Sequence, residues 1–360
     1  MWSIVLGGDV MLGRTFNDLK PRSPWGLRLQ KLISEADLTA VNLETSITDS
    51  VVKWPGKAFN FRLSPHLAFQ ILPLSGIDHV ALANNHIEDF GLKGLKDTME
   101  TLDMLNITHS GAGLDISGAT QLVVHQLFRG DDRQQKPLKV GFMSFSDQMP
   151  EWAATPSSAG IAFVDIYGDN QKQDLNKNQL FGWKDAMEKV AAAHNLVDLL
   201  IVQVHQGPNW EWTPSQNVKD FDRALIESGA DIIVGTSAHH VQGSEVYRVY
   251  DSLTGKDRTG LILYGLGDMV DDYAIDQNYR SDLGAVVELL IEKEPAASFV
   301  TKNSFLLNNN DGFDIFSGKV HVTATVHPIK ISGYRADLAT DFDDVRFVRD
   351  RIGFSRRSIF

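Results

Sequence analysis

Apolar residues in this chain fall into continuous runs and helical stripes, and their order predicts a protein that mixes strands with helices. A run at residues 3–6 enters a glycine pair, and similar runs lie at residues 37–44, 78–83 and 196–204. Such runs are typical of strands buried on both faces of a sheet. Further strands are predicted at residues 59–63, 120–128, 138–145, 231–234, 245–250, 261–264, 285–292 and 319–331. Helices are predicted at residues 25–35, 65–74, 91–106, 174–194, 214–228 and 342–352.

The order of these elements indicates the fold class. Strands and helices alternate early in the chain, and hairpins dominate late. This mixture predicts an α/β protein with two mixed sheets packed face to face and helices outside. A division into two domains near Phe145 is disfavoured, because polar candidate residues occur on both sides of that point.

Polar side chains with related chemistry follow five of the predicted strands. They are Asp9, Glu44, Asn85 with His86, His205, and His239 with His240. In open α/β folds the carboxyl ends of strands form the functional site. Carboxylate, amide and imidazole ligands suit manganese, iron or zinc better than calcium. Each of these residues also has an interpretation that involves no metal. A lone acid after a strand is often a helix N-cap, and a lone histidine is often a hydrogen-bonded core residue.

Composition and charge restrict the function classes. The 360 residues carry a net charge of −12, which argues against a nucleic-acid partner. The chain has no cysteine, which excludes disulfides and thiolate chemistry. No apolar run approaches the ~18 residues of a membrane span. The N-terminal residues do not resemble a signal peptide, so a cytoplasmic location is expected.

Several loop residues are candidates for substrate contacts. Trp54, Trp210, Trp212 and Tyr273 would wall a peptide-sized pocket or anchor their own loops. Arg14 and Lys57 would pair with a substrate carboxylate or phosphate, or form surface ion pairs. The acids Asp268, Asp271 and Asp272 would provide a general base, support the site from behind, or form a plain acidic turn.

Short motifs distributed over most of the chain resemble those of the CapA family. They are GDVMLGR at residues 8–14, NLE at 42–44, WPGK at 54–57, LANNH at 82–86, HQGPNW at 205–210 and LYGLGD at 263–268. CapA proteins are poly-γ-glutamate capsule synthesis-type proteins of the calcineurin-like metallophosphoesterase superfamily. The resemblance spans residues 4 to about 290 and implies a single domain over residues 1–360. Its motif-bearing core would be residues 3–290, followed by C-terminal strands and a helix at 319–352.

The resemblance also implies a site. It implies a four-layer α/β/β/α sandwich that holds one or two divalent ions, manganese, iron or zinc, at strand carboxyl ends. The implied ligands are Asp9, Glu44 as a bridging carboxylate, Asn85, His205 and His239. His86 would act as general acid or oxyanion stabiliser. His240 would either support the ligands from behind or act as a second acid–base residue. The candidate substrate contacts, chosen from the loops beside this site, are Arg14, Trp54, Lys57, Asn209, Trp210 and Tyr273.

Three positions depart from the superfamily pattern. Met11 occupies the usual place of a histidine two residues after the first aspartate. Thr236 follows Gly235 where another imidazole is usual, and Gln206 replaces the usual tryptophan after His205. These departures place a complete two-metal site in question.

Three functions follow from these residues. The first is a metal-dependent hydrolase that acts on a phosphoester or on γ-glutamyl and peptide amides. The second is a metal-dependent peptide epimerase that removes a Cα proton. The third is a non-catalytic capsule polymer assembly protein. The expected partner is a peptide, polyglutamate or phosphoester substrate, and the sequence does not specify an oligomeric state.

Overall fold

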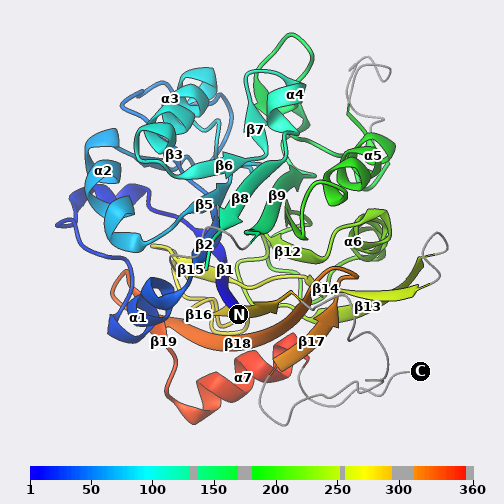
Figure 1. Ribbon diagram of the computed structural model, residues 1–360. Helices are drawn as coiled ribbons and strands as arrows, with labels where there is room; N and C mark the ends of the chain where they lie inside the picture. Colours follow the sequence, from blue (N-terminus) through cyan, green and yellow to red (C-terminus); the bar gives the residue numbers. More distant parts are fainter. Residues whose placement is uncertain (130–135, 169–180, 252–255, 294–311, 354–360) are drawn as a thin grey trace.

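The opening apolar run forms β1 (Trp2–Val10), the middle strand of the first of two large sheets in the computed structural model (Figure 1). The structure describes residues 1–129, 136–168, 181–251, 256–293 and 312–353. In those residues the first sheet has the order β17-β18-β16-β1-β2-β5-β6, with β15 beside β1 and β19 beside β18. Its other strands are β2 (Leu38–Leu43), β5 (His79–Ala81), β6 (Thr108–Ser110), β15 (Asp268–Val270), β16 (Leu283–Glu292), β17 (Gly312–Phe316), β18 (His321–Ile331) and β19 (Ala336–Leu338).

The second large sheet has the order β13-β14-β12-β11-β9-β8. Its strands are β8 (Val123–Leu127), β9 (Leu138–Ser146), β11 (Leu199–His205), β12 (Ile232–Thr236), β13 (Ser244–Asp251) and β14 (Lys256–Leu263). Both sheets are mixed. In the first, β1-β2-β5-β6 are parallel and β16, β18 and β17 add antiparallel pairs. In the second, β9, β11, β12 and β14 are parallel and the edge strands β8 and β13 are antiparallel. Short pairs β3 (Ser46–Ile47) with β4 (Arg62–Leu63) and β7 (Ala112–Gly113) with β10 (Gly160–Ile161) lie outside them.

The helices lie on either side of the strands (Figure 1). They are α1 (Leu27–Glu35), α2 (Pro65–Ser75), α3 (Gly91–Met104), α4 (Ile116–Ala119), α5 (Trp183–His194), α6 (Gln216–Ser228) and α7 (Phe342–Ile352), with 3-10 turns η1 (Arg14–Asp18) and η2 (Pro150–Trp152). Across the described ranges, no helix is long and apolar enough to cross a membrane.

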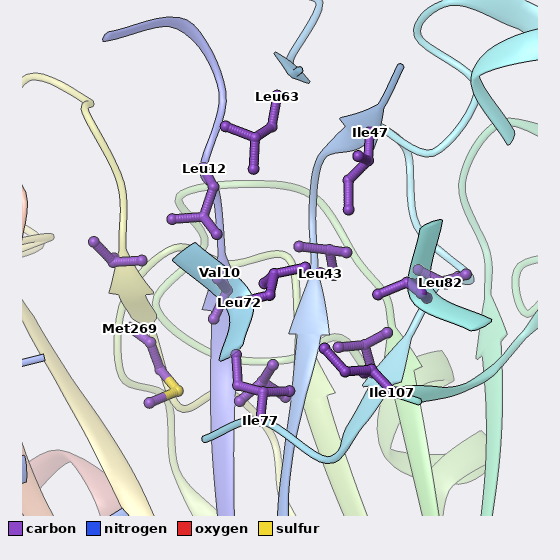
Figure 2. Close-up of a cluster of buried hydrophobic side chains, with 14 of the residues drawn as sticks. Val10, Leu12, Leu43, Ile47, Leu63, Leu72, Ile77, Leu82, Ile107 and Met269 are labelled. Carbon is purple, nitrogen blue, oxygen red and sulfur yellow. The ribbon is translucent and has the colours of Figure 1, made fainter. Parts of the chain in front are cut away.

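Alternate side chains of β1 face two different hydrophobic clusters, as the pleat of a strand requires. Val5 belongs to a cluster with Leu72 and other side chains of α1, α2 and α3. Ile4 belongs to a cluster with Phe142 and other residues of the second sheet. Figure 2 shows part of the first cluster, where side chains from strands, a helix and loops meet: Val10, Leu12, Leu43, Leu72 and Ile77. A third cluster joins the second sheet to α5 and α6. The fold is therefore a mixed α/β fold in which each large sheet has helices packed against it.

Most of the predicted elements are present, and the differences have local causes. Helix α2 begins as predicted, because the Ser64 side chain accepts a hydrogen bond from the Leu67 N–H. Of the strand predicted at residues 59–63, only β4 (Arg62–Leu63) is observed, and the rest of the prediction is wrong. The Phe61 side chain there stacks on the His86 ring. Helix α6 begins two residues later than predicted because Ser215, and not Thr213, caps it.

The predicted helix at 174–194 lies partly outside the described residues and is observed from Trp183. Strands β6, β15, β17 and β19 were not predicted.

Substitution of Gly8 tests the close contact between β1 and the loop before β15. A Cβ at Gly8 would lie 1.9 Å from the Gly267 carbonyl oxygen. We expect Gly8→Ala to lower the free energy of unfolding by about 1–3 kcal/mol, because overpacking forces the backbone apart. Urea denaturation measures this. At Gly118 the nearest atom would be 3.5 Å away, so Gly118→Ala is the matched control. Equal stability of the two variants would contradict the packing described.

Candidate metal centre

Three acidic positions of the first sheet converge because of strand register. Asp9 of β1 lies opposite Asn42 of β2 on one side and opposite Asp268 of β15 on the other. Glu44 follows β2 directly, and its backbone N–H donates to the Val10 carbonyl oxygen at 3.0 Å. The Asn42 side chain donates to Asp9 Oδ1 at 2.6 Å and thereby fixes that carboxylate. The carboxyl ends of β1 and β2 and the first residue of β15 thus bring Asp9, Glu44 and Asp268 to one place.

The second sheet supplies the imidazoles. His205 is the last residue of β11 and lies opposite Thr236 of β12, whose Oγ1 is 2.9 Å from His205 Nδ1. The loop after β12 then turns through Ser237 and His239, which have φ values of 94° and 57°. Non-glycine residues rarely adopt these angles, and such strain concentrates at functional sites. The turn places the Ser237 N–H 3.1 Å from Asp9 Oδ2, to which it donates.

Four buried side chains form a group that could hold a metal ion. Asp9, Glu44, His239 and Asp268 each offer a ligand atom, and these atoms lie within 4.8 Å of one another. His239 Nδ1 is 3.0 Å from Asp268 Oδ1, 3.9 Å from Glu44 Oε2 and 4.0 Å from Asp9 Oδ2. Carboxylates with an imidazole are a usual ligand set for manganese, iron or zinc.

The electrostatics of this group favour a bound cation. Both carboxylate oxygens of Glu44 and Oδ2 of Asp268 are buried without a hydrogen-bond partner. Burial raises the pKa of Glu44 well above its usual range, and the neighbouring Asp9 and Asp268 charges raise it further. Burial also raises the pKa of Asp268 and of Asp9. A buried carboxylate without a partner is costly, and a divalent ion between these oxygens would remove that cost, so the residues fit a metal.

A second set of polar groups lies on the other side of Glu44. His205 Nε2 is 3.1 Å from Asn85 Oδ1 and 3.8 Å from Glu44 Oε1. His86 Nε2 is also 3.8 Å from Glu44 Oε1. Glu44 therefore lies between the group that contains Asp9 and the group formed by Asn85 and His205. The structure brings together all five ligands that the sequence suggests.

His86 is held by three neighbours. Its Nδ1 lies 2.6 Å from Asp89 Oδ2, which fixes the ring so that Nε2 faces Glu44. The Phe61 ring stacks on it with centroids 4.0 Å apart. Lys57 pairs with Asp89, and its Nζ is 3.0 Å from His86 Nδ1. Burial lowers the pKa of His86 to about 4, although the Asp89 carboxylate acts in the opposite direction.

The aromatic and basic candidates surround the group at different distances. The rings of Tyr273 and Trp210 lie 5.2 and 5.5 Å from the His239 ring. Arg14 lies over the Tyr273 ring at 5.4 Å and forms an ion pair with Asp272. Asn209 Oδ1 lies 3.3 Å from the Ser237 hydroxyl. Trp54 packs edge-on against Trp152, with ring centroids 5.4 Å apart, and this contact anchors its loop.

His240 points elsewhere. Its Nε2 and Nδ1 lie 3.0 and 3.2 Å from the carbonyl oxygens of Glu211 and Val241. Its ring packs on Trp212 and Tyr279, with centroids 5.2 and 4.7 Å apart. These contacts place the His240 side chain in an aromatic cluster beside the metal-binding group.

The departures from the superfamily pattern have clear local roles. Met11 is buried, and its sulfur accepts a hydrogen bond from the Gly13 N–H at 3.1 Å. Thr236 orients His205 through its hydroxyl group. Gln206 donates to the buried Asp222 carboxylate at 2.8 Å.

Three residues of the centre have roles that the sequence did not specify. Asp268 belongs to the metal-binding group. The sequence had suggested for it only the role of a general base, of an acid that supports the site, or of part of an acidic turn. Asn42 fixes Asp9, and Asp89 fixes His86. The three-residue spacing from His86 to Asp89 was the available signal for the last pair.

Comparison with known proteins identifies the family. The family described as "Bacterial capsule synthesis protein PGA_cap" matches residues 3–273, about three quarters of the chain. The chain belongs to this family. The matched residues include every side chain of the centre described above, which supports the sequence-based recognition of a CapA-type protein.

Three bacterial relatives match this chain over most of its length. A probable polyglutamine synthesis accessory protein of Mycobacterium tuberculosis is 31% identical over 78% of this chain and 78% of its own length. The capsule biosynthesis protein CapA of Bacillus anthracis is 26% identical over 84% of this chain and 71% of its own. The PGA biosynthesis protein CapA of Bacillus subtilis is 24% identical over 81% and 68%.

Replacement of Glu44 tests the metal centre. Glu44→Gln keeps the side-chain shape and removes one buried negative charge that has no hydrogen-bond partner. We expect the metal-free variant to melt no lower than the metal-free wild type, because the substitution removes the repulsion of Glu44 by Asp9 and Asp268. Its affinity for Mn²⁺ should fall at least about tenfold, because a ligand is lost.

Calorimetric titration with Mn²⁺ measures the affinity. Glu288→Gln is the control, since Glu288 lies on β16 and contacts His327 at 3.1 Å rather than the metal-binding group. Unchanged Mn²⁺ affinity in Glu44→Gln would remove Glu44 from the ligand set.

Proposed function

We propose that this protein is a metal-dependent hydrolase that cleaves γ-linked glutamyl amides. The observation that supports it most is the Glu44 carboxylate, which is buried, has no hydrogen-bond partner, and lies between His239 on one side and His205 and His86 on the other. The relatives are named for polyglutamine synthesis or PGA biosynthesis, which favours a glutamyl polymer over a phosphoester as the substrate.

We assign Asp9, Glu44, His239 and Asp268 as ligands of one divalent ion. Asn85 and His205 contact each other on the other side of Glu44 and complete the site there. Met11 and Thr236 cannot supply the imidazoles of a complete second site. A divalent ion bound here acts as a Lewis acid toward a carbonyl or phosphoryl oxygen. We also infer that the two sheets and their helices form the four-layer α/β/β/α sandwich of metallophosphoesterases.

His86 is the residue placed to move the proton. Its Nε2 faces the metal-binding group, and Asp89 holds the opposite ring nitrogen. In amide hydrolysis one proton must leave the attacking water and one must reach the departing amine. The stacked Phe61 ring keeps the imidazole in this orientation. Arg14, above Phe61 and Tyr273, is placed to attract the α-carboxylates of a glutamyl chain.

Amine release from poly-γ-glutamate tests this function. Each hydrolysed amide frees one amino group, so Mn²⁺-loaded protein should produce new primary amines, and a chelator should stop their release. His86→Ala should keep its Mn²⁺ and lower kcat by roughly 10²–10⁴-fold. The exposed His66 on α2 gives the matched control, and His66→Ala should match wild type.

The outcomes of parallel assays separate the alternatives. Phosphate release from p-nitrophenyl phosphate without amine release would contradict the amide assignment. Incorporation of deuterium at Cα in heavy water without chain cleavage would contradict hydrolysis and indicate epimerisation. Full activity of His86→Ala would remove His86 from the mechanism.

A further inference from the structure

A cavity of about 720 Å³ lies on the second-sheet side of the metal-binding group. Its walls come from the loops after β9 and β11, the start of α6, and Gln242 and Tyr264. This volume falls within the range of sites that bind small molecules. The proposed function does not by itself use this cavity.

The cavity wall is joined to the metal-binding group through a single residue. Ser237 donates its backbone N–H to Asp9 Oδ2 at 3.1 Å. Its hydroxyl accepts a hydrogen bond from Gln148 at 2.6 Å and lies 3.3 Å from Asn209 Oδ1. Gln148 and Asn209 both line the cavity, and so does Gln206, which follows His205 directly. A molecule in the cavity therefore lies beside the metal-binding group.

The wall carries two carboxylates, and its other polar side chains are amides and hydroxyls that can both donate and accept hydrogen bonds. Asp147 and Glu211 contribute carboxylates, and none of the described residues that line the cavity is a lysine or arginine. Both Asp147 oxygens face the Gly207 N–H, at 3.0 and 3.2 Å. The Gln206 side chain is only 5% exposed; it donates to Asp222, and its Oε1 has no partner. These groups match a guest that donates hydrogen bonds and is positively charged.

Basic side chains lie at the other side of the centre. Arg14 is beside Phe61 and Tyr273, and Lys57 is beside His86. Arg14 and Lys57 are already paired with Asp272 and Asp89, whereas no described residue that lines the cavity offers its carboxylates a lysine or arginine. A carboxylate in the cavity would face Asp147 and Glu211, and like charges at close range repel.

We propose that the cavity binds the terminal amino group of a γ-linked glutamyl chain. In such a polymer every residue has an α-carboxylate, but the ammonium group occurs only at one end. This inference rests on the proposed function and adds a direction to it: cleavage starts from the amino end of the chain.

Calorimetric binding of two peptides tests the proposal. The probes are γ-glutamyl-γ-glutamylglutamate and its N-acetyl derivative, each titrated into Mn²⁺-loaded protein. The free peptide should bind at least about tenfold more tightly, because an ammonium–carboxylate hydrogen bond contributes more than a neutral one. Asp147→Asn and Glu211→Gln should each reduce this preference to less than about threefold.

Glu188→Gln on the exposed face of α5 is the control, since it removes the same charge from an ion pair with Lys184. It should keep the wild-type preference. Equal binding of the two peptides, binding of neither, or a preference unchanged in both cavity variants would overturn the proposal. Amine release from poly-γ-glutamate without a preference for the free peptide would retain the proposed function and reject the amino-group site.

Discussion

Several carboxylates are buried together at this centre with too little positive charge beside them. The arrangement of the centre depends on how that negative charge is balanced. Asp9, Glu44 and Asp268 are almost completely buried, and burial raises the pKa of each. Burying such groups unpaired costs several kcal/mol each by general estimates. The hydrogen bonds from Asn42 and Ser237 satisfy only Asp9. A divalent ion held between these oxygens would compensate the buried charge.

The fold supplies the rigidity that such a cluster needs. The side chains of the metal-binding group come from strands of two sheets and the segments next to them, and the sheets pack through a shared apolar core that fixes their separation. The turn at Ser237 and His239 adopts backbone angles that cost energy, and the surrounding strands maintain it. On one side of the centre are Arg14 and Lys57, and on the other is a cavity with acceptor groups. Arg14 and Lys57 are neutralised by Asp272 and Asp89, whereas no described residue that lines the cavity is a lysine or arginine.

Long apolar strands and capped helices were predictable from the sequence, because their signals are local. Helix α7 has the predicted bounds, since Asp341 caps its start and Gly353 ends it with a φ of 91°. The three-residue β15 was not predictable, because so short a strand has no periodic pattern and exists only through pairing with β1. Asp268 was missed as a ligand for the same reason. The orientation of His240 depends on its packing against Trp212 and Tyr279, which no local pattern reveals.

The central claim is that Asp9, Glu44, His239 and Asp268 hold a divalent cation. X-ray diffraction from crystals grown with Mn²⁺, collected near the manganese absorption edge, tests it most directly. The account predicts an anomalous peak among these four side chains, at about 2.1–2.3 Å from their ligand atoms as general metal–ligand distances require. An ordered cluster with no anomalous peak, or a peak only at other residues, would contradict it.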